Sequence, residues 1–281
     1  MSGPERARDS GARRLAESAL AALLHAAGDR STELVLIGGL VPEYLVEADE
    51  PHQGTNDVDL LLDIGLQYDR EDDDYAWLER ALARAGFVPV SPNVGWRWMV
   101  DVDGFPVVVE FLTDVADDLD QEIALPGVAT LSVKNLRGPG PALRDASVAS
   151  VLGEQVRMTD LGGYLAAKGA AAYWRRADKD LYDFAWVLVN ASRADSTRAA
   201  IAVSAVLDPG VDRDRWGAVL GVCALFEAVT SEGTEVFVST ALAAGSEQDA
   251  NSLALDAVLA VRLFRAGLQG QFPGDVTRAQ P

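Results

Sequence analysis

Four short apolar runs stand out along the first half of the chain, and each has the length and composition of a β-strand. They are rich in β-branched or aromatic residues and are bounded by Gly, Pro, Asn or Asp, as buried strands usually are. The last two flank an Asp-Gly dipeptide at 103–104, which is typical of a tight hairpin. The pattern predicts one mixed sheet. Its strands are expected at Leu34–Ile37, Val58–Leu62, Trp96–Val102 and Pro106–Leu112.

Helical periodicity takes over elsewhere, most of all in the second half. Helices are expected at 5–28, 41–48, Tyr75–Ala85, Leu161–Arg176 and Leu181–Val189. The stretch 199–268 is rich in Ala, Val and Leu and predicts a helical bundle. The fold class is therefore α+β. We expect a sheet domain at 1–135 and a mainly helical domain at 136–281, with the Gly/Pro-rich piece 137–141 as a connection or hinge.

Composition is that of an ordinary soluble globular protein, with 49% hydrophobic and 24% charged residues in 281. No apolar run approaches the roughly 18 residues that span a bilayer, and the N-terminus does not resemble a signal peptide. The single Cys223 excludes an internal disulfide framework and favours a cytoplasmic location. A net charge of −19 argues against binding nucleic acid through a broad basic surface.

Two acidic residues open the second apolar run, where an unpaired carboxylate is costly. Asp57 and Asp59 are two positions apart, so on a strand they project from the same face. In the fourth run Glu110 alternates with Val109 and Phe111 and points away from them. Carboxylate oxygens are the ligands that Mg²⁺ prefers. The pattern indicates a site for one or two Mg²⁺ ions, although a lone acid such as Glu110 can also be a solvent-facing strand residue.

The first apolar run ends in Gly38-Gly39, close in sequence to the acidic pair. Glycine lacks a Cβ and lets the backbone approach a phosphate closely. The backbone N–H groups at the start of the following helix, near Pro42, are expected to bind the terminal phosphates of a nucleotide.

A cluster of cations lies in the stretch KGAAAYWRRADKDLYD at 168–183. On one continuous helix, Lys168, Arg175 and Lys179 would fall within about 40° of one another and could hold phosphates. The alternative is a solvated face with i,i+4 ion pairs. In the phosphate-binding arrangement, Asp180 or Asp183 would orient the cations or would only join two helices.

Together these motifs resemble the nucleotidyltransferase superfamily with the DNA polymerase β-type fold, and within it the AbiEii-type toxins of bacterial toxin–antitoxin systems. The resemblance depends on Gly38-Gly39, on TNDVD at 55–59, on Glu110, and on Lys168 with Ala171 and Arg175 followed by KDLYD at 179–183. It covers roughly 33–190. Many members have Gly-Ser at the paired glycine, and the family arginine usually lies one position earlier, so Arg175 and Arg176 both remain candidates.

The resemblance implies an Mg²⁺-dependent transfer of a nucleoside monophosphate from an NTP to an acceptor hydroxyl. It implies catalytic roles for Asp57, Asp59, Glu110 and Lys168, with the three acids as metal ligands. The implied nucleotide-binding residues are Gly38, Gly39, Thr55, Arg175, Lys179 and Asp180.

Three functions stay open. A toxin of this kind would modify tRNA and pair with a cognate antitoxin protein. A small-molecule enzyme would take an acceptor such as an aminoglycoside, which the acidic composition favours. A non-catalytic member would bind only nucleotide or a partner. No membrane partner is expected. Two further residues are expected to be incidental to function, His52 as a surface histidine and Cys223 as a buried small hydrophobe.

Overall fold

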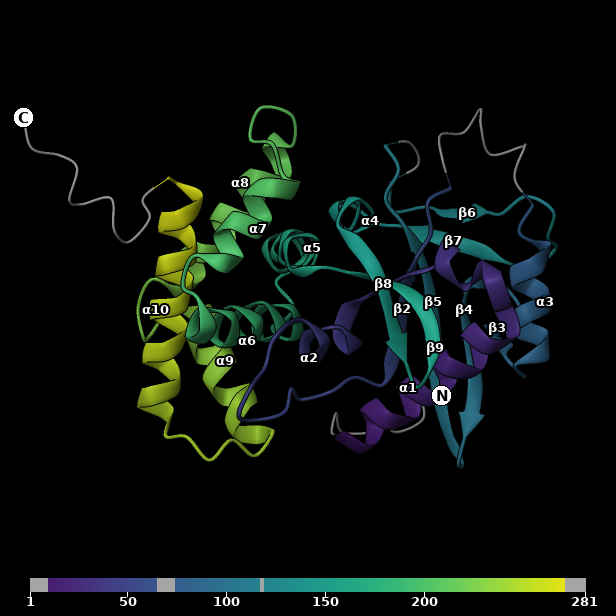
Figure 1. The fold of residues 1–281 in the computed structure, drawn as a ribbon, viewed down its shortest axis with the longest axis horizontal. Coiled ribbons are helices and arrows are strands. Elements are labelled where there is room, and N and C mark those ends of the chain that lie inside the picture. Colours follow the sequence, from purple (N-terminus) through teal and green to yellow (C-terminus); the bar gives the residue numbers. More distant parts are fainter. Residues whose placement is uncertain (1–9, 65–73, 117–118, 271–281) are drawn as a thin grey trace, which may run out of the picture. The chain divides into compact units, whose positions relative to one another are not determined.

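The computed structural model describes residues 10–64, 74–116 and 119–270 (Figure 1). The chain forms two compact units. The first contains residues up to Val41 and from Gly54 to Thr159, and the second contains Pro42–Gln53 and everything from Asp160. The boundary thus lies at 159/160 and not at 135/136.

The first unit is built on one mixed sheet, with nine strands among the described residues. Its main path runs β3-β4-β5-β2-β1-β9-β8, and β7 pairs with both β5 and β6 beside that path. Strand β2 is antiparallel to β1 and parallel to β5, while β4 and β5 form an antiparallel hairpin. The strands are β1 Val35–Ile37, β2 Asp57–Leu61, β3 Val88–Ser91, β4 Val94–Val102, β5 Phe105–Thr113, β6 Glu122–Ala124, β7 Ser132–Asn135, β8 Ala146–Val151 and β9 Glu154–Thr159.

These strands confirm the predicted mixed sheet and its hairpin. Asp103 and Gly104 both adopt positive φ, 54° and 84°, which is the backbone that an Asp-Gly hairpin turn requires. Strand β9 pairs in parallel with β1, so a boundary at residue 135 would divide the sheet. The Gly/Pro-rich piece is a connection inside this unit: the backbone N–H groups of Gly138 and Gly140 donate to the Asp114 carboxylate at 3.0 and 2.7 Å.

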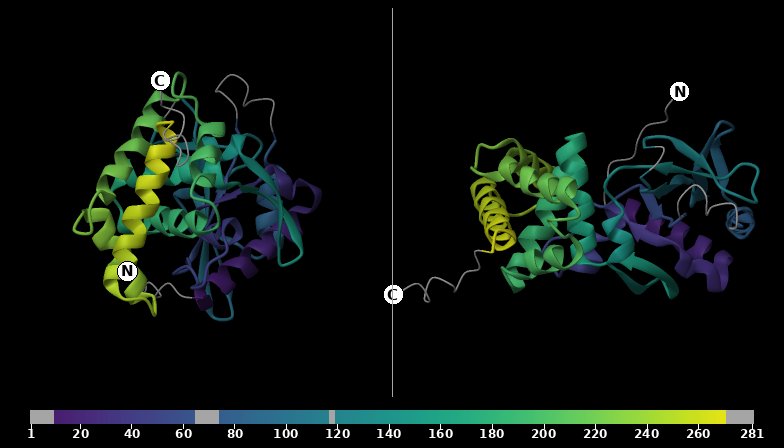
Figure 2. Two further views of the ribbon diagram at one scale, coloured as in Figure 1. Left: turned by 60° about the vertical axis from the view of Figure 1, so that its left-hand side comes forward. Right: turned by 90° about the horizontal axis from the view of Figure 1, so that it is seen from above.

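Helices of the first unit pack on this sheet (Figure 2). Helix α1 (Ser10–Ala27) packs against β2, β5 and β9 and against α3 (Ala76–Arg84). Its Leu20, Leu23 and Leu24 are almost completely buried. Helix α3 ends before Gly86, whose φ is +81°, as the sequence predicts. The 3-10 helix η1 (Gly28–Glu33) precedes β1, η2 (Gly38–Leu40) follows it, and α4 (Pro141–Arg144) packs on it.

The second unit is helical, as predicted for the C-terminal part. Helix α5 contacts α6, α7 and α8, and α6 contacts α9 and α10. The elements are α2 Pro42–Leu45, α5 Leu161–Arg175, α6 Asp178–Ala194, α7 Arg198–Val206, α8 Arg213–Cys223, η4 Ala224–Phe226, α9 Glu232–Ala243 and α10 Ala250–Leu268.

Two predicted helices differ from the observed ones. The helix expected at 41–48 is the single turn α2, which ends where the Arg198 side chain donates to the carbonyl of Leu45 at 3.3 Å. The helices predicted at 161–176 and 181–189 are α5 and α6, and the second begins earlier than predicted, at Asp178. The continuous helix that would align three cations is not formed, because Arg176 takes the left-handed conformation (φ 53°) and Ala177 is extended. Lys179 therefore belongs to α6, and of the two alternatives the single cationic face across 168–179 is not the one observed.

Candidate functional site

The acidic residues of the sheet share one face of two neighbouring strands. In the parallel pairing of β2 with β5, Asp57 lies opposite Val108 and Asp59 lies opposite Glu110. Directly paired residues point to the same side of a sheet, as do residues two positions apart on one strand. Asp57, Asp59 and Glu110 therefore project from one face. Their neighbours Val58 and Val109 point to the other face and are completely buried.

The end of β1 is in direct contact with this acidic face. Ile37 pairs with Asp59, and the next residue, Gly38, has a φ of +76°. A Cβ on Gly38 would lie 1.8 Å from Oδ2 of Asp59, and one on Gly39 would lie 2.8 Å from the Cβ of Thr55. Both glycines are thus required for the backbone to pass this close to the acidic loop and strand.

We predict that Gly38→Ala displaces the Asp59 carboxylate. The positive φ alone costs about 1–2 kcal/mol, and the clash adds about 1–3 kcal/mol. Misplacing a catalytic group by about 1 Å can lower turnover on the order of a hundredfold. Gly104→Ala is the matched control, since Gly104 has a φ of +84° and nothing within 4 Å of an added Cβ. Equal losses of stability and activity in both variants, by urea titration and nucleotide-transfer assay, would contradict the assignment.

Thr55 orients the first carboxylate. Its buried hydroxyl donates to Oδ1 of Asp57, and the backbone N–H of Asp57 points back at that hydroxyl at 3.4 Å. Thr55 also packs against Gly39. Five of the predicted site residues therefore form one contiguous group: Gly38, Gly39, Thr55, Asp57 and Asp59. Thr55 was predicted to bind nucleotide, and its observed contacts are with the Asp57 carboxylate and Gly39.

Glu110 is engaged by a cation that the sequence did not reveal. Arg97 on β4 pairs in register with Glu110, so it lies on the acidic face. Its Nε is 3.0 Å from Oε1 of Glu110, with 39% and 19% of the two side chains exposed. The Arg97 guanidinium also lies 5.4 Å from the centre of the Trp96 ring. Arg97 is identified as the partner of Glu110 by the register of β4 with β5, which cannot be read from the sequence.

The residue types on this face suit a hard cation, because two carboxylates on one strand and a third at the paired position are all oxygen ligands. Within the described residues, however, no group of three or more His, Cys, Asp or Glu side chains is placed to hold a metal ion. The three-carboxylate metal site stays a prediction. Asp57 and Asp59 would supply the first ligands, and Glu110 would join them after leaving Arg97.

The same face becomes apolar beyond the acids. Leu61 and Leu112 follow Asp59 and Glu110 at two-residue spacing and pack with Val35, Ile37 and Ala142 in one buried cluster. The carboxylates thus stand at the border of a dry patch, where the local dielectric strengthens their interaction with any cation.

Lys168 and the KDLYD segment form a separate group within the second unit. Lys168 Nζ is 3.1 Å from Oδ1 of Asp180 and 2.9 Å from Oδ2 of Asp183. Only 11% of the lysine side chain is exposed, and the two aspartates are 0% and 3% exposed. Because Lys168 lies on α5 and both aspartates lie on α6, the cluster joins these two helices. The contacts agree with both roles expected for the aspartates, because they join α5 to α6 and hold the Lys168 ammonium in place.

The charges of this cluster stabilise one another. Burial lowers the pKa of Lys168, but the negative charges of Asp183 and Asp180 outweigh it and raise that pKa well above its ordinary value. For Asp183, burial raises the pKa, but the opposing effects of Lys168 and His52 are larger. The pKa of Asp183 therefore lies below the usual range. Lys168 and Asp183 are thus both held in their charged forms.

His52 extends this cluster and is not the surface histidine that the sequence suggested. Its side chain is completely buried, with Nε2 2.9 Å from Oδ1 of Asp183. The ring packs at 5.3 Å from Tyr182 and at 5.1 Å from Trp186. Its backbone N–H donates to Glu43 at 2.9 Å. Burial of a loop histidine depends on contacts with α6, which no local pattern encodes.

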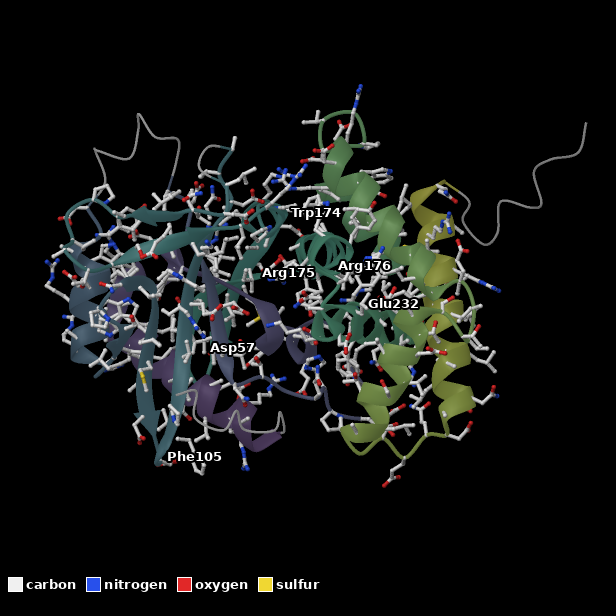
Figure 3. All side chains as sticks on the ribbon, turned by 180° about the vertical axis from the view of Figure 1, so that it is seen from behind. Asp57, Phe105, Trp174, Arg175, Arg176 and Glu232 are labelled. Carbon is white, nitrogen blue, oxygen red and sulfur yellow. The ribbon has the colours of Figure 1, made fainter. Side chains whose placement is uncertain are left out.

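The remaining predicted cations are more exposed than Lys168. Arg175 and Arg176 lie next to each other at the end of α5 (Figure 3). Arg175 is 2.8 Å from Oδ2 of Asp180 and 52% exposed, and Arg176 is 3.1 Å from Glu232. Lys179 is exposed on α6. Arg175 therefore shares Asp180 with Lys168, whereas Arg176 contacts α9. Between the two candidate arginines, only Arg175 belongs to the cluster around Lys168.

Cys223 is buried, as predicted, and its thiol donates to the carbonyl of Val219 at 3.2 Å. Burial raises the pKa of this thiol to about 12. A thiol with this pKa is not a nucleophile near neutral pH.

No protein-family model and no curated protein matches this chain. Among solved structures, the chain is similar to an antigenic nucleotidyltransferase-like protein from Paracoccidioides brasiliensis. The identity is 14% and the TM-score is 0.36, with 77% of this chain and 95% of the other covered. A likeness of this degree does not assign the chain to a family. The described helices include none with the length and hydrophobicity of a membrane span.

Proposed function

We propose that this protein is a nucleotidyltransferase, which moves a nucleoside monophosphate from an NTP to an acceptor hydroxyl. The observation that supports the proposal is the face shared by Asp57, Asp59 and Glu110 on two paired strands, with the Gly38 turn in contact with Asp59. Keeping several carboxylates together at the edge of an apolar cluster is costly unless positive charge balances them, and Arg97 supplies one positive charge beside three acidic residues. Binding of Mg²⁺ and a polyphosphate to this face would explain why these carboxylates are kept together.

In the proposed reaction, an acceptor oxygen forms a bond to the α-phosphorus while the bond to the bridging oxygen of the leaving pyrophosphate breaks. Bound Mg²⁺ would supply charge neutralisation at the phosphate oxygens. Asp57 and Asp59 would hold it, with Thr55 fixing the orientation of Asp57. Glu110 would accept the proton of the attacking hydroxyl. The Gly38-Gly39 turn lets the backbone approach the phosphates. The involvement of Lys168, Arg175 and Lys179 in triphosphate binding remains a prediction from sequence.

The acceptor has two candidates. Resemblance to AbiEii-type toxins favours tRNA, together with an antitoxin partner. The net charge of −19 favours a cationic small molecule such as an aminoglycoside, because a polyanionic RNA is repelled by a strongly acidic protein.

Incubation with each α-³²P-labelled NTP and Mg²⁺, with either total tRNA or an aminoglycoside panel, tests both. We expect label to move to one acceptor class and EDTA to prevent the transfer. Label on RNA supports the toxin, and label on the drug supports the small-molecule enzyme. No transfer to either acceptor contradicts the enzymatic proposal and favours a protein that only binds nucleotide or a partner.

A further inference from the structure

Glu110 lies between two neighbours of opposite charge, one on each adjacent strand. Strand β5 lies between β4 and β2 in the sheet. In register with Glu110, β4 presents Arg97 and β2 presents Asp59. All three side chains project from the same face, since each is directly paired. A glutamate has enough rotatable bonds to turn toward either neighbouring strand.

Without a cation, the position of Glu110 follows from charge. The Asp59 carboxylate repels it, and the Arg97 guanidinium attracts it at 3.0 Å. This orientation agrees with the lack of an assembled three-carboxylate group among the described residues. A divalent ion held by Asp57 and Asp59 would reverse the balance, because it attracts Glu110 more strongly than a single positive charge does.

We propose that Arg97 is a positioning residue that competes with the metal ion for Glu110, so that metal binding and release of the Arg97–Glu110 pair are coupled. The proposal rests on the proposed function, whose metal site it regulates. Both partners are partly exposed, so the pair is weak. A weak pair suits this role, because the metal has to displace it. The apparent metal affinity is the intrinsic affinity multiplied by the fraction of molecules in which Glu110 is free, and a weak pair keeps this fraction large enough for the metal to bind.

The test is binding of Mn²⁺ to the nucleotide-free protein, followed by the electron paramagnetic resonance signal of the unbound ion. Arg97→Gln is expected to tighten Mn²⁺ binding by about fivefold, the upper range for a partly exposed ion pair. Arg97→Lys keeps the charge and should restore most of the wild-type affinity. In a Glu110→Gln background, Arg97→Gln should no longer tighten binding.

Arg30→Gln is the matched control for the loss of one positive charge. Arg30 also pairs with a glutamate, Glu33 at 2.7 Å, and its guanidinium lies 4.6 Å from the centre of the Trp77 ring. An equal gain in Arg30→Gln and Arg97→Gln, or a gain that persists without Glu110, would overturn the proposal. So would an unchanged affinity in Arg97→Gln. If the protein transfers no nucleotide, but Arg97→Gln tightens Mn²⁺ binding only when Glu110 is present, the result rejects the proposed catalysis and leaves the proposed role of Arg97 intact.

Discussion

Asp59→Asn is expected to fold as the wild type does and to lose nucleotide transfer by at least about a thousandfold. Removing even one group that stabilises developing charge costs about 10²–10³ in turnover. Asp59 is placed to do more, because it neighbours Glu110 across the strands and contacts the Gly38 turn. The measurement is single-turnover transfer at saturating NTP, together with Mn²⁺ binding.

Asp63→Asn is the control for this variant, since Asp63 follows the same strand at its other end and is exposed. It removes the same charge and should retain activity. Full activity in Asp59→Asn would refute the metal assignment. Loss of activity with unchanged Mn²⁺ affinity would place the metal elsewhere.

Lys168→Met is expected to destabilise the second unit by about 3–5 kcal/mol. Removing one member of a buried ion cluster leaves the others buried and uncompensated, and losses of about this size follow. Here two nearly inaccessible carboxylates, those of Asp180 and Asp183, would lose their common buried partner and keep only their contacts with Arg175 and His52. Lys179→Met removes the same charge from the exposed side of α6 and should change stability by less than about 0.5 kcal/mol. Urea denaturation followed by circular dichroism measures both.

The loss of stability in Lys168→Met should depend on pH, because the pKa values of Lys168 and Asp183 are shifted in the folded protein. The raised pKa of Lys168 means that its contribution is complete below 10.5 and is lost as the pH rises through the higher folded value. The lowered pKa of Asp183 means that its contribution is complete above 3.8 and is lost as the pH falls toward the folded value. The stability gap between wild type and Lys168→Met should be largest between these limits. It should shrink in acid, where the carboxylates of the variant become protonated.

A different outcome would change the interpretation of Lys168. If Lys168→Met kept wild-type stability but lost transfer activity, the lysine would be a phosphate-binding residue, as the sequence motif implies. If both stability and activity fell, Asp183→Asn would separate the two roles, because it weakens the cluster while Lys168 and Asp180 remain.

The sequence alone determined the features that depend on local spacing. Strand alternation placed Asp57 and Asp59 on one face, the Asp-Gly dipeptide specified the β4–β5 hairpin, and apolar periodicity indicated the helices. These follow from the period of two in strands and 3.6 in helices, which is the same in every fold. The same alternation separated Glu110 from its neighbours Val109 and Phe111, whereas its position opposite Asp59 depends on strand pairing.

Only the tertiary structure decided which groups meet. The contact of Gly38 with Asp59, the pairing of Arg97 with Glu110 and the burial of His52 against Asp183 each join residues far apart in the chain. The sequence predicted a division between two helices near Arg176, but not the left-handed backbone at Arg176 that produces it, because a left-handed residue that is not glycine carries no local signature. The charge on a side chain can be known from its identity, but its partner, and hence its role, depends on strand register and helix packing.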